Sequence, residues 1–329
     1  MPILVYKKNK IGLRKLDEDL FEFKNDSNAI SYFDAKTEQD DLLNLCSCLF
    51  KVVSEFNFSL DSKKRNLVYF TVGYSKEYID LLKCCIFSIV FNCKDLSNVD
   101  FLLITDDKQS FDEVSKTFPD LNLNCLVFPK AKDGVEASMN KLKVFEYKNI
   151  FKYKKILFLD ADIVLNNDVN QIFNLDIQDH KIYSLTHEGC GYQVHNSKYH
   201  NITQYTKEKI NRLTKLKIKP FNAGQFLMLS SVGMARHFTN IKYITDLWQK
   251  DYFFEQSFLN TYFNYNEAAN TSLLEDCFSI YYIAQHKIES LKLDKNKNIH
   301  YAGDPCNGST KLEFLKSEFP NYYGVLART

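Results

Sequence analysis

The chain has 329 residues, of which 45% are hydrophobic and 25% charged, and its formal net charge is +1 at pH 7. This length allows one large α/β domain or two ordinary ones, and the nearly neutral balance disfavours a nucleic-acid partner, which usually requires a strongly basic domain. No apolar run reaches the length of a membrane span, and the N-terminus MPILVYKKNK lacks the apolar centre of a signal peptide, so we expect a cytoplasmic protein. The odd number of cysteines, nine, agrees with a reducing compartment.

Residues 1–62 are predicted to be an N-terminal extension, followed by the main domain over residues 63–329. Weak alternation over residues 4–23 predicts a small hairpin. Apolar residues at helical spacing predict a helix over about residues 39–56. The extension carries no recognisable chemistry, so packing on the main domain and binding a partner both remain open.

From Asn66 onward the pattern becomes regular. Apolar runs predict strands at 67–72, 99–107 and 123–129, and helical spacing predicts helices at 76–93, 111–119 and 139–153. Alternation of this kind indicates parallel strands, right-handed crossovers and a ligand site at the carboxyl ends of the strands. Three pairs of residues fall at such ends: Gly73 and Tyr74, Asp106 and Asp107, and Asp160 and Asp162.

The segment ILFLDADIVL, residues 156–165, is predicted to be a strand buried on both faces. Because side chains alternate along a strand, Asp160 and Asp162 are expected on one side, with the small Ala161 facing away. Two carboxylates so placed suit a divalent cation. Because they repel each other, Asp162→Asn is expected to stabilise the metal-free protein. The alternative interpretation is a solvated turn after a core strand.

The first strand is followed by TVGYSKEY, which is neither a GxGxxG loop nor a GxxxxGK[ST] loop. Dinucleotide-dependent oxidoreductases and P-loop enzymes are therefore disfavoured. A nucleotide base could still stack on Tyr74 or Tyr78. Both tyrosines equally fit boundary positions that pack on the core.

In the second half, residues 180–193 are predicted to be a strand that runs into a loop, and a polar stretch over 190–219 contains a helix near 206–216. Residues 220–231 form an apolar strand that opens with Phe221-Asn222-Ala223-Gly224. Helices are predicted at 234–250 and 255–264, followed by a short strand near HYAG and a helix from about Thr310.

Four motifs occur in a fixed order: FLDADIVL, FNAG before an apolar strand, EQSFLNTYFN, and HYAG with a later lysine. Together they resemble the retaining GT-A glycosyltransferases of family 8, the glycogenin-like and galactosyltransferase-like enzymes, over about residues 67–315. The resemblance implies an α/β GT-A fold, a Rossmann-like nucleotide-diphospho-sugar transferase fold with a mixed, mainly parallel central sheet.

The resemblance also implies a cation site. Asp160 and Asp162 fill the positions that hold Mn²⁺ (or Mg²⁺) on the donor diphosphate, and Asp160 also lies near the ribose. His300 fills the position of a third ligand, and a donor set of two carboxylates and one imidazole fits manganese. Lys141 matches a lysine that approaches the donor.

Further positions carry over from the resemblance to the donor. Asn222 and Gln256 match residues that hydrogen-bond the donor sugar, whereas Glu255 stands where the family usually has aspartate. The uridine edge corresponds to Thr71, Gly73 and Tyr74, and Gly303 of HYAG lies at the cofactor site. Lys311 would reach a phosphate, unless it is an exposed helix lysine. Gly308, Ser309 and Thr310 are equally able to supply backbone donors there.

The expected function is therefore metal-dependent, retaining transfer of a sugar from a nucleotide-diphosphate donor, most simply a UDP-sugar, to a saccharide or protein acceptor. A sugar nucleotidyltransferase and a catalytically silent nucleotide-sugar-binding protein are the alternatives. Glu188 and Glu255 are the candidates for a carboxylate beneath the sugar, although a same-face displacement needs neither. A homodimer is left open.

The polar stretch 190–219 contains polar aromatic side chains, and its second half is basic. Loops of this length in a compact domain are usually functional or disordered. We expect it to select the acceptor, and the alternative is a solvated insertion without a role. The aromatic residues are Tyr192, His195, Tyr199, His200 and Tyr205, and the basic ones are Lys207, Lys209, Arg212, Lys215, Lys217 and Lys219.

Overall fold

The structure is a computed structural model that describes residues 65–73, 75–186, 207–215, 219–247, 254–283, 296–303 and 311–320, and four N-terminal strands. The chain forms two compact units, Met1–Leu60 and Asp61–Thr329. In the first unit, the strands β1 (Leu4–Tyr6), β2 (Asn9–Lys15), β3 (Leu20–Lys24) and β4 (Ile30–Asp34) pair antiparallel in chain order. The predicted hairpin is part of this meander, and the predicted helix over 39–56 lies outside the described residues.

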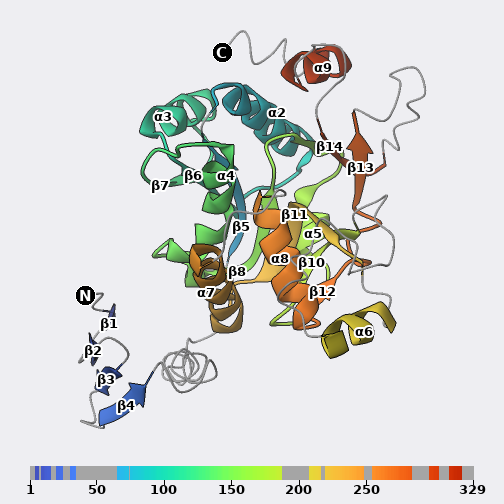
Figure 1. Ribbon diagram of the computed structural model, residues 1–329. Helices are drawn as coiled ribbons and strands as arrows, with labels where there is room; N and C mark the ends of the chain where they lie inside the picture. Colours follow the sequence, from blue (N-terminus) through green and yellow to red (C-terminus); the bar gives the residue numbers. More distant parts are fainter. Residues whose placement is uncertain are drawn as a thin grey trace. The chain divides into compact units, whose positions relative to one another are not determined.

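The second unit is built on a seven-stranded sheet (Figure 1). Its order is β12-β10-β11-β8-β5-β6-β7. Neighbouring strands are parallel in β5–β6, β6–β7, β5–β8 and β10–β12, and antiparallel in β8–β11 and β10–β11. The expected mixed, mainly parallel sheet is confirmed. The strands are β5 (Arg65–Val72), β6 (Val99–Thr105), β7 (Leu123–Val127), β8 (Tyr153–Leu159), β10 (Ile182–Thr186), β11 (Phe221–Leu229) and β12 (Ala269–Asn270).

Helices cover both faces of this sheet, because the inner strands are apolar on both sides. In β5, Val68 and Phe70 belong to one buried cluster, and Leu67 and Tyr69 belong to the other. The first cluster includes α2 (Glu77–Asn92), α3 (Lys108–Thr117), α5 (Val169–Phe173) and α9 (Lys311–Glu318). The second includes the 3₁₀ helix η1 (Asn140–Glu146) together with α7 (Val232–Leu247) and α8 (Phe254–Tyr265).

The predicted helix over 139–153 is wrong. The chain instead forms α4 (Gly134–Met139), η1, the short 3₁₀ helix η2 (Ile150–Lys152) and the start of β8. The Asp133 side chain accepts a hydrogen bond from the Glu136 N–H and caps α4 at an earlier point than expected. Leu142 and Val144 are both buried, and a spacing of two does not place both side chains on one face of an α-helix.

The segment 156–165 is not one continuous strand. The main chain leaves β8 after Leu159, and the Ile163 N–H bonds to the Asp160 carbonyl across a turn. Ile163 and Val164 then form β9, which joins β13 (Phe278–Tyr282) and β14 (Asn298–Ala302) in a separate three-stranded sheet. The side-chain alternation assumed for Asp160 and Asp162 therefore does not hold, although the turn still brings them to one site.

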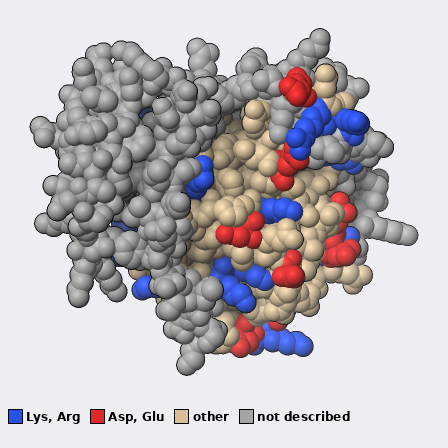
Figure 2. Space-filling model, turned by 90° about the horizontal axis from the view of Figure 1, so that it is seen from below, with Lys and Arg blue, Asp and Glu red and all other residues tan. Residues whose placement is uncertain are grey.

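Of the polar stretch 190–219, the structure describes α6 (Lys207–Lys215) and Lys219. Tyr192, His195, Tyr199, His200 and Tyr205 lie outside the described residues. The helix agrees with the one predicted, and Arg212 forms an ion pair with Glu267 at 2.8 Å. Among the described residues, no helix combines the length and apolar character needed to cross a membrane. Acidic and basic side chains alternate over the described part of the face in Figure 2.

Candidate active site

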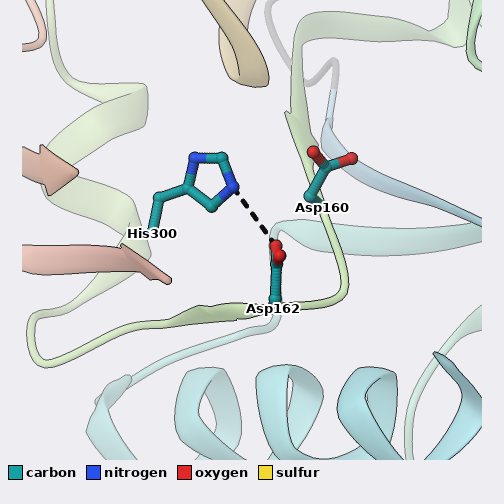
Figure 3. A group of neighbouring side chains, drawn as sticks. All are labelled: Asp160, Asp162 and His300. Carbon is teal, nitrogen blue, oxygen red and sulfur yellow. Dashed lines mark ion pairs between the residues drawn. The ribbon is translucent and has the colours of Figure 1, made fainter. Parts of the chain in front are cut away.

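Three metal-ligating side chains converge at the carboxyl end of β8. Asp160, Asp162 and His300 each offer a ligand atom, and these atoms all lie within 4.8 Å of one another (Figure 3). Asp160 follows β8, Asp162 lies in the turn before β9, and His300 comes from β14. The buried Asp162 Oδ1 lies 3.3 Å from His300 Nε2 but accepts no hydrogen bond from the described residues. Two carboxylates and an imidazole, with one buried oxygen that accepts no hydrogen bond, fit a divalent cation such as Mn²⁺.

Asp160 is the more exposed of the two aspartates. Its main-chain N–H donates to the Gly224 carbonyl at 2.7 Å, which fixes the end of β8 against β11. Its carboxylate lies 3.3 Å from the Lys141 ammonium, and about a third of the side chain is exposed. Burial, opposed by Lys141 and reinforced by Asp162, raises the pKa of Asp160 to about 6. Without a cation, this carboxylate lies in an environment that disfavours its charge.

Asp162, in contrast, lies in surroundings that favour its charge. Its Oδ2 accepts a hydrogen bond from Lys311 Nζ at 2.6 Å, and its Oδ1 lies 3.3 Å from His300 Nε2. Burial alone would raise the pKa of Asp162, but the charges of Lys311 and His300 outweigh it and hold that pKa below its usual range. The Lys311 side chain is only 11% exposed, so Lys311 is paired at the site and is not an exposed helix lysine.

His300 is placed by β14, which pairs with β13 on one side and with β9 on the other. Its ring packs over Gly224: a Cβ added at this glycine would lie 2.1 Å from His300 Cε1. The missing side chain of Gly224 therefore makes room for the proposed metal-ligating histidine.

Lys141 is buried in η1 and joins three elements. Its ammonium contacts the Ala223 carbonyl of β11 at 2.9 Å, Asp160 Oδ1 at 3.3 Å, and the Glu255 carboxylate of α8. Burial lowers the pKa of Lys141, but the charges of Asp160 and Glu255 outweigh this effect and raise it. Because an ammonium has three N–H donors, these three acceptors use its full hydrogen-bonding capacity.

Asn222 and Gln256 both face the main chain of FNAG. Asn222 Oδ1 accepts from the Gly224 N–H at 2.7 Å, and Gln256 Oε1 accepts from the Ala223 N–H at 2.9 Å. Their side-chain oxygens are thus engaged within the protein, and only their amide nitrogens can donate to a sugar in this arrangement. Glu255 is buried against Lys141.

Some of the residues predicted to bind the nucleotide lie along the same edge of the sheet. Thr71 is the penultimate residue of β5, and Gly73 follows that strand directly. Tyr78 lies in the first turn of α2 with 43% of its surface exposed. Gly303 is exposed just after β14 and has a φ of 79°. Tyr74, Glu188, Gly308, Ser309 and Thr310 lie outside the described residues.

Three contacts near the site were not predicted from the sequence. Lys311 pairs with Asp162 across 149 residues, and Lys141 pairs with Glu255 across 114. The third is the packing of Asp106 on Gly73 at the end of β6. The only signal for Asp106 was its place at the end of a predicted strand, and that signal does not distinguish it from its neighbour Asp107.

Comparison with solved structures shows the same fold at low sequence identity. The galactosyltransferase LgtC, in complex with donor and acceptor sugar analogs, is 14% identical with a TM-score of 0.52, over 79% of this chain and 95% of that one. An active-site mutant of LgtC is 12% identical with a TM-score of 0.51 and the same coverage. The bifunctional enzyme WbbM is 12% identical with a TM-score of 0.50, over 76% of this chain but only 47% of its own length. Among curated proteins, no sequence matches this chain.

The fold and the site define a GT-A glycosyltransferase. The sequence model described as Glycosyl transferase family 8 matches residues 70–311, and the chain belongs to this family. The predicted family and enzyme class are confirmed, and the alternative of a sugar nucleotidyltransferase is set aside.

Proposed function

We propose that this glycosyltransferase is metal-dependent, uses a UDP-sugar as its donor and retains the configuration at the anomeric carbon. The convergence of Asp160, Asp162 and His300 carries the proposal, since their ligand atoms lie within 4.8 Å of one another at the carboxyl edge of the sheet. A divalent cation held there would offset the charge that develops on the departing diphosphate.

Lys311 would supply a second positive charge to the diphosphate. Its ammonium lies 2.6 Å from Asp162 Oδ2, so a phosphate bound beside this carboxylate is within its reach. Lys141 has a different role, because its three donors are directed to Ala223, Asp160 and Glu255. We propose that it positions these groups and does not contact the donor directly, in contrast to the role implied by the family resemblance.

The sugar would be bound by the amide nitrogens of Asn222 and Gln256. Their oxygens already hold the N–H groups of Gly224 and Ala223, and the same amides can donate outward to sugar hydroxyls. Glu255 is unsuited as a nucleophile beneath the sugar, since it is buried and paired with Lys141. The other candidate carboxylate, Glu188, lies outside the described residues. We propose a same-face displacement assisted by the leaving phosphate, which needs neither carboxylate.

The proposal is tested by a donor panel. The purified protein is incubated with Mn²⁺ and each of several nucleotide sugars, with hydrolysis of the donor and the thermal midpoint as readouts. We expect UDP-sugars to be hydrolysed and to raise the midpoint only with the cation present. Equal protection with excess EDTA would contradict metal dependence, and a preference for another nucleotide would contradict the UDP donor.

A further inference from the structure

Three side-chain amides of α8 follow the main chain at the start of β11. Gln256, Asn260 and Asn264 are four residues apart, so they lie on one face of the helix. The Ala223 N–H donates to Gln256 Oε1 at 2.9 Å. Asn260 makes two such bonds: its Oδ1 accepts from the Phe221 N–H at 2.6 Å, and its Nδ2 donates to the Phe221 carbonyl at 2.8 Å. We call these three residues of α8 the amide ladder.

The amide ladder fits the strand because the two repeats have nearly the same length. Four residues of an α-helix rise about 6 Å, and two residues of a β-strand rise about 6.6 Å. Asn264 Nδ2 contacts the Lys219 carbonyl at 3.4 Å and Asn260 Oδ1 at 3.3 Å, so the ladder continues along residues 219–223. A side-chain amide offers the same acceptor and donor atoms as a peptide group. In this segment α8 therefore supplies hydrogen bonds that a neighbouring strand would otherwise supply.

These bonds begin where the pairing of β11 with β8 ends. The last pair in that register is Gln225 with Leu159, after which the chain turns at Asp160. Phe221 and Asn260 are both 0% exposed, so the main-chain groups of Phe221 have no access to water. A buried N–H or carbonyl without a partner is costly, and Asn260 satisfies one of each. Asn260 thus holds the main chain at the first residue of FNAG.

We propose that Asn260 is a positioning residue for the donor sugar, an inference that rests on the proposed sugar contacts Asn222 and Gln256. Asn260 fixes the residue before Asn222, and its Nδ2 also donates to the Gln256 carbonyl at 3.0 Å. Both sugar contacts therefore extend from main chain that Asn260 holds in place. Asn260 itself is buried and acts through these two residues.

The experiment measures the affinity of the full-length protein with Mn²⁺ for UDP, UDP-glucose, UDP-galactose and UDP-N-acetylglucosamine. For the UDP-sugar that binds best, Asn260→Ala should lower the ratio of UDP-sugar affinity to UDP affinity by about tenfold, because two hydrogen bonds are lost. Its affinity for UDP should stay within about threefold of wild type, since the proposed cation ligands come from other elements. Hydrolysis of the donor should fall by about 100-fold, as for other small displacements of a bound substrate.

Asn240→Ala is the matched control. Asn240 of α7 is also a buried amide, and its Nδ2 donates to Tyr262 Oη of α8 at 2.9 Å. This substitution removes a hydrogen bond to the same helix, but not one to FNAG. We expect the affinity ratio of Asn240→Ala to equal that of wild type. Thermal midpoints establish that each variant is folded.

A measurement on wild type applies even if Asn260→Ala does not fold. Hydrogen exchange of the Phe221 and Ala223 amides is followed with UDP and with the UDP-sugar that binds best. Because the amide ladder holds both N–H groups, we expect their exchange to be about tenfold slower with the UDP-sugar than with UDP. Equal exchange with the two ligands would contradict the inference.

A further variant, Gln256→Ala, separates the inference from the proposed function. If it lowers the affinity ratio and Asn260→Ala does not, the sugar contacts stand and Asn260 does not position them. If neither variant lowers the ratio, the proposed sugar contacts are wrong, and the role of Asn260 is wrong with them. An equal decrease in Asn240→Ala would show that any loosening of α8 has this effect, and it would also overturn the inference.

Discussion

Asp160 and Asp162 are two residues apart, yet their carboxylates lie in different surroundings. Lys311 and His300 favour the charge of Asp162, whereas burial disfavours that of Asp160. From the sequence, repulsion between the two carboxylates was expected to make the charge of Asp162 destabilising in the metal-free protein. The lowered pKa of Asp162 instead indicates that the surroundings favour its charge. The raised pKa of Asp160 indicates that the unfavourable charge is that of Asp160.

Asp162→Asn should abolish metal-dependent transfer and lower the stability of the metal-free protein by about 3 kcal/mol, since Lys311 loses a buried partner. The folded pKa of Asp162 lies below its unfolded value. This contribution is therefore present above about pH 4 and lost as the pH falls further. Urea unfolding in EDTA at pH 7 measures the loss, with the exposed Asp120→Asn as control. Turnover close to wild type would exclude Asp162 as a ligand.

Gly224→Ala should displace the His300 ring, because the added methyl group would lie 2.1 Å from Cε1. We expect Mn²⁺ affinity to fall by about tenfold or more, as when the support of a metal ligand is removed. Gly134→Ala is the matched control, since a Cβ there meets nothing within 4 Å. Titration with Mn²⁺ measures both variants, and equal affinities would show that His300 does not bind the ion.

At the scale of elements, the site is held together by contacts between segments distant in the sequence. Lys141 ties η1 to β11 and α8, and the small sheet β13-β14-β9 carries His300 to the end of β8. Each of these contacts buries charged or polar groups. Removing one partner therefore leaves the other group buried without its compensating charge or hydrogen bond.

Lys141→Met should destabilise the protein by about 3–5 kcal/mol, because the Glu255 carboxylate would remain buried without its partner. Adding Glu255→Gln should recover part of this loss, since the buried charge is then removed as well. Chemical denaturation of the single and double variants gives the coupling energy. Strictly additive effects would contradict a direct interaction between the two side chains.

The packing of α7 against α8 should depend on pH. His237 of α7 contacts Tyr262 Oη of α8 at 3.1 Å, and burial, with His180 and Arg236, lowers the pKa of His237 to about 4. The unfolded chain therefore takes up the proton first, and stability is lost as the pH falls below about 6.5. His237→Gln should reduce the loss between pH 7 and pH 5 by about 1–2 kcal/mol. An unchanged pH profile would exclude this residue as the cause.

At the scale of the whole molecule, the proposed cation ligands Asp160 and Asp162 follow β8, and the location of the acceptor site is a separate question. In the sequence, the polar stretch 190–219 comes just before FNAG. Its described helix α6 is joined to Glu267, just beyond α8, through Arg212. We propose that this stretch selects the acceptor.

Replacing residues 192–217 with a short glycine–serine linker should spare metal-dependent hydrolysis of the donor but remove transfer to the true acceptor. Both rates are measured on the same preparation, so a folding defect would lower the two together. Glu267→Gln is the control, because it breaks the ion pair with Arg212 and leaves the stretch in place. Unchanged transfer would place acceptor selection elsewhere, with residues 1–62 next to be tested.

The sequence alone determined the family and the main elements, because FLDADIVL, FNAG and HYAG are local patterns on strongly apolar strands. It also predicted Asp160, Asp162 and His300 as one group, through their family resemblance. The strand prediction for residues 156–165 failed where the chain turns. Alternation of side chains cannot show that β8 ends at Leu159 or that β9 belongs to another sheet. In the same way, helical spacing did not distinguish η1 from an α-helix.

Only the tertiary structure decided which charges meet. Lys311 reaches Asp162, Lys141 reaches Glu255, and Asp106 fills the space at Gly73, because strand order and crossover helices bring distant segments to one edge of the sheet. Electrostatic interactions depend on distance and burial in space, and neither quantity is a function of spacing along the chain. The two aspartates of one short motif therefore acquired opposite pKa shifts from residues that the motif does not contain.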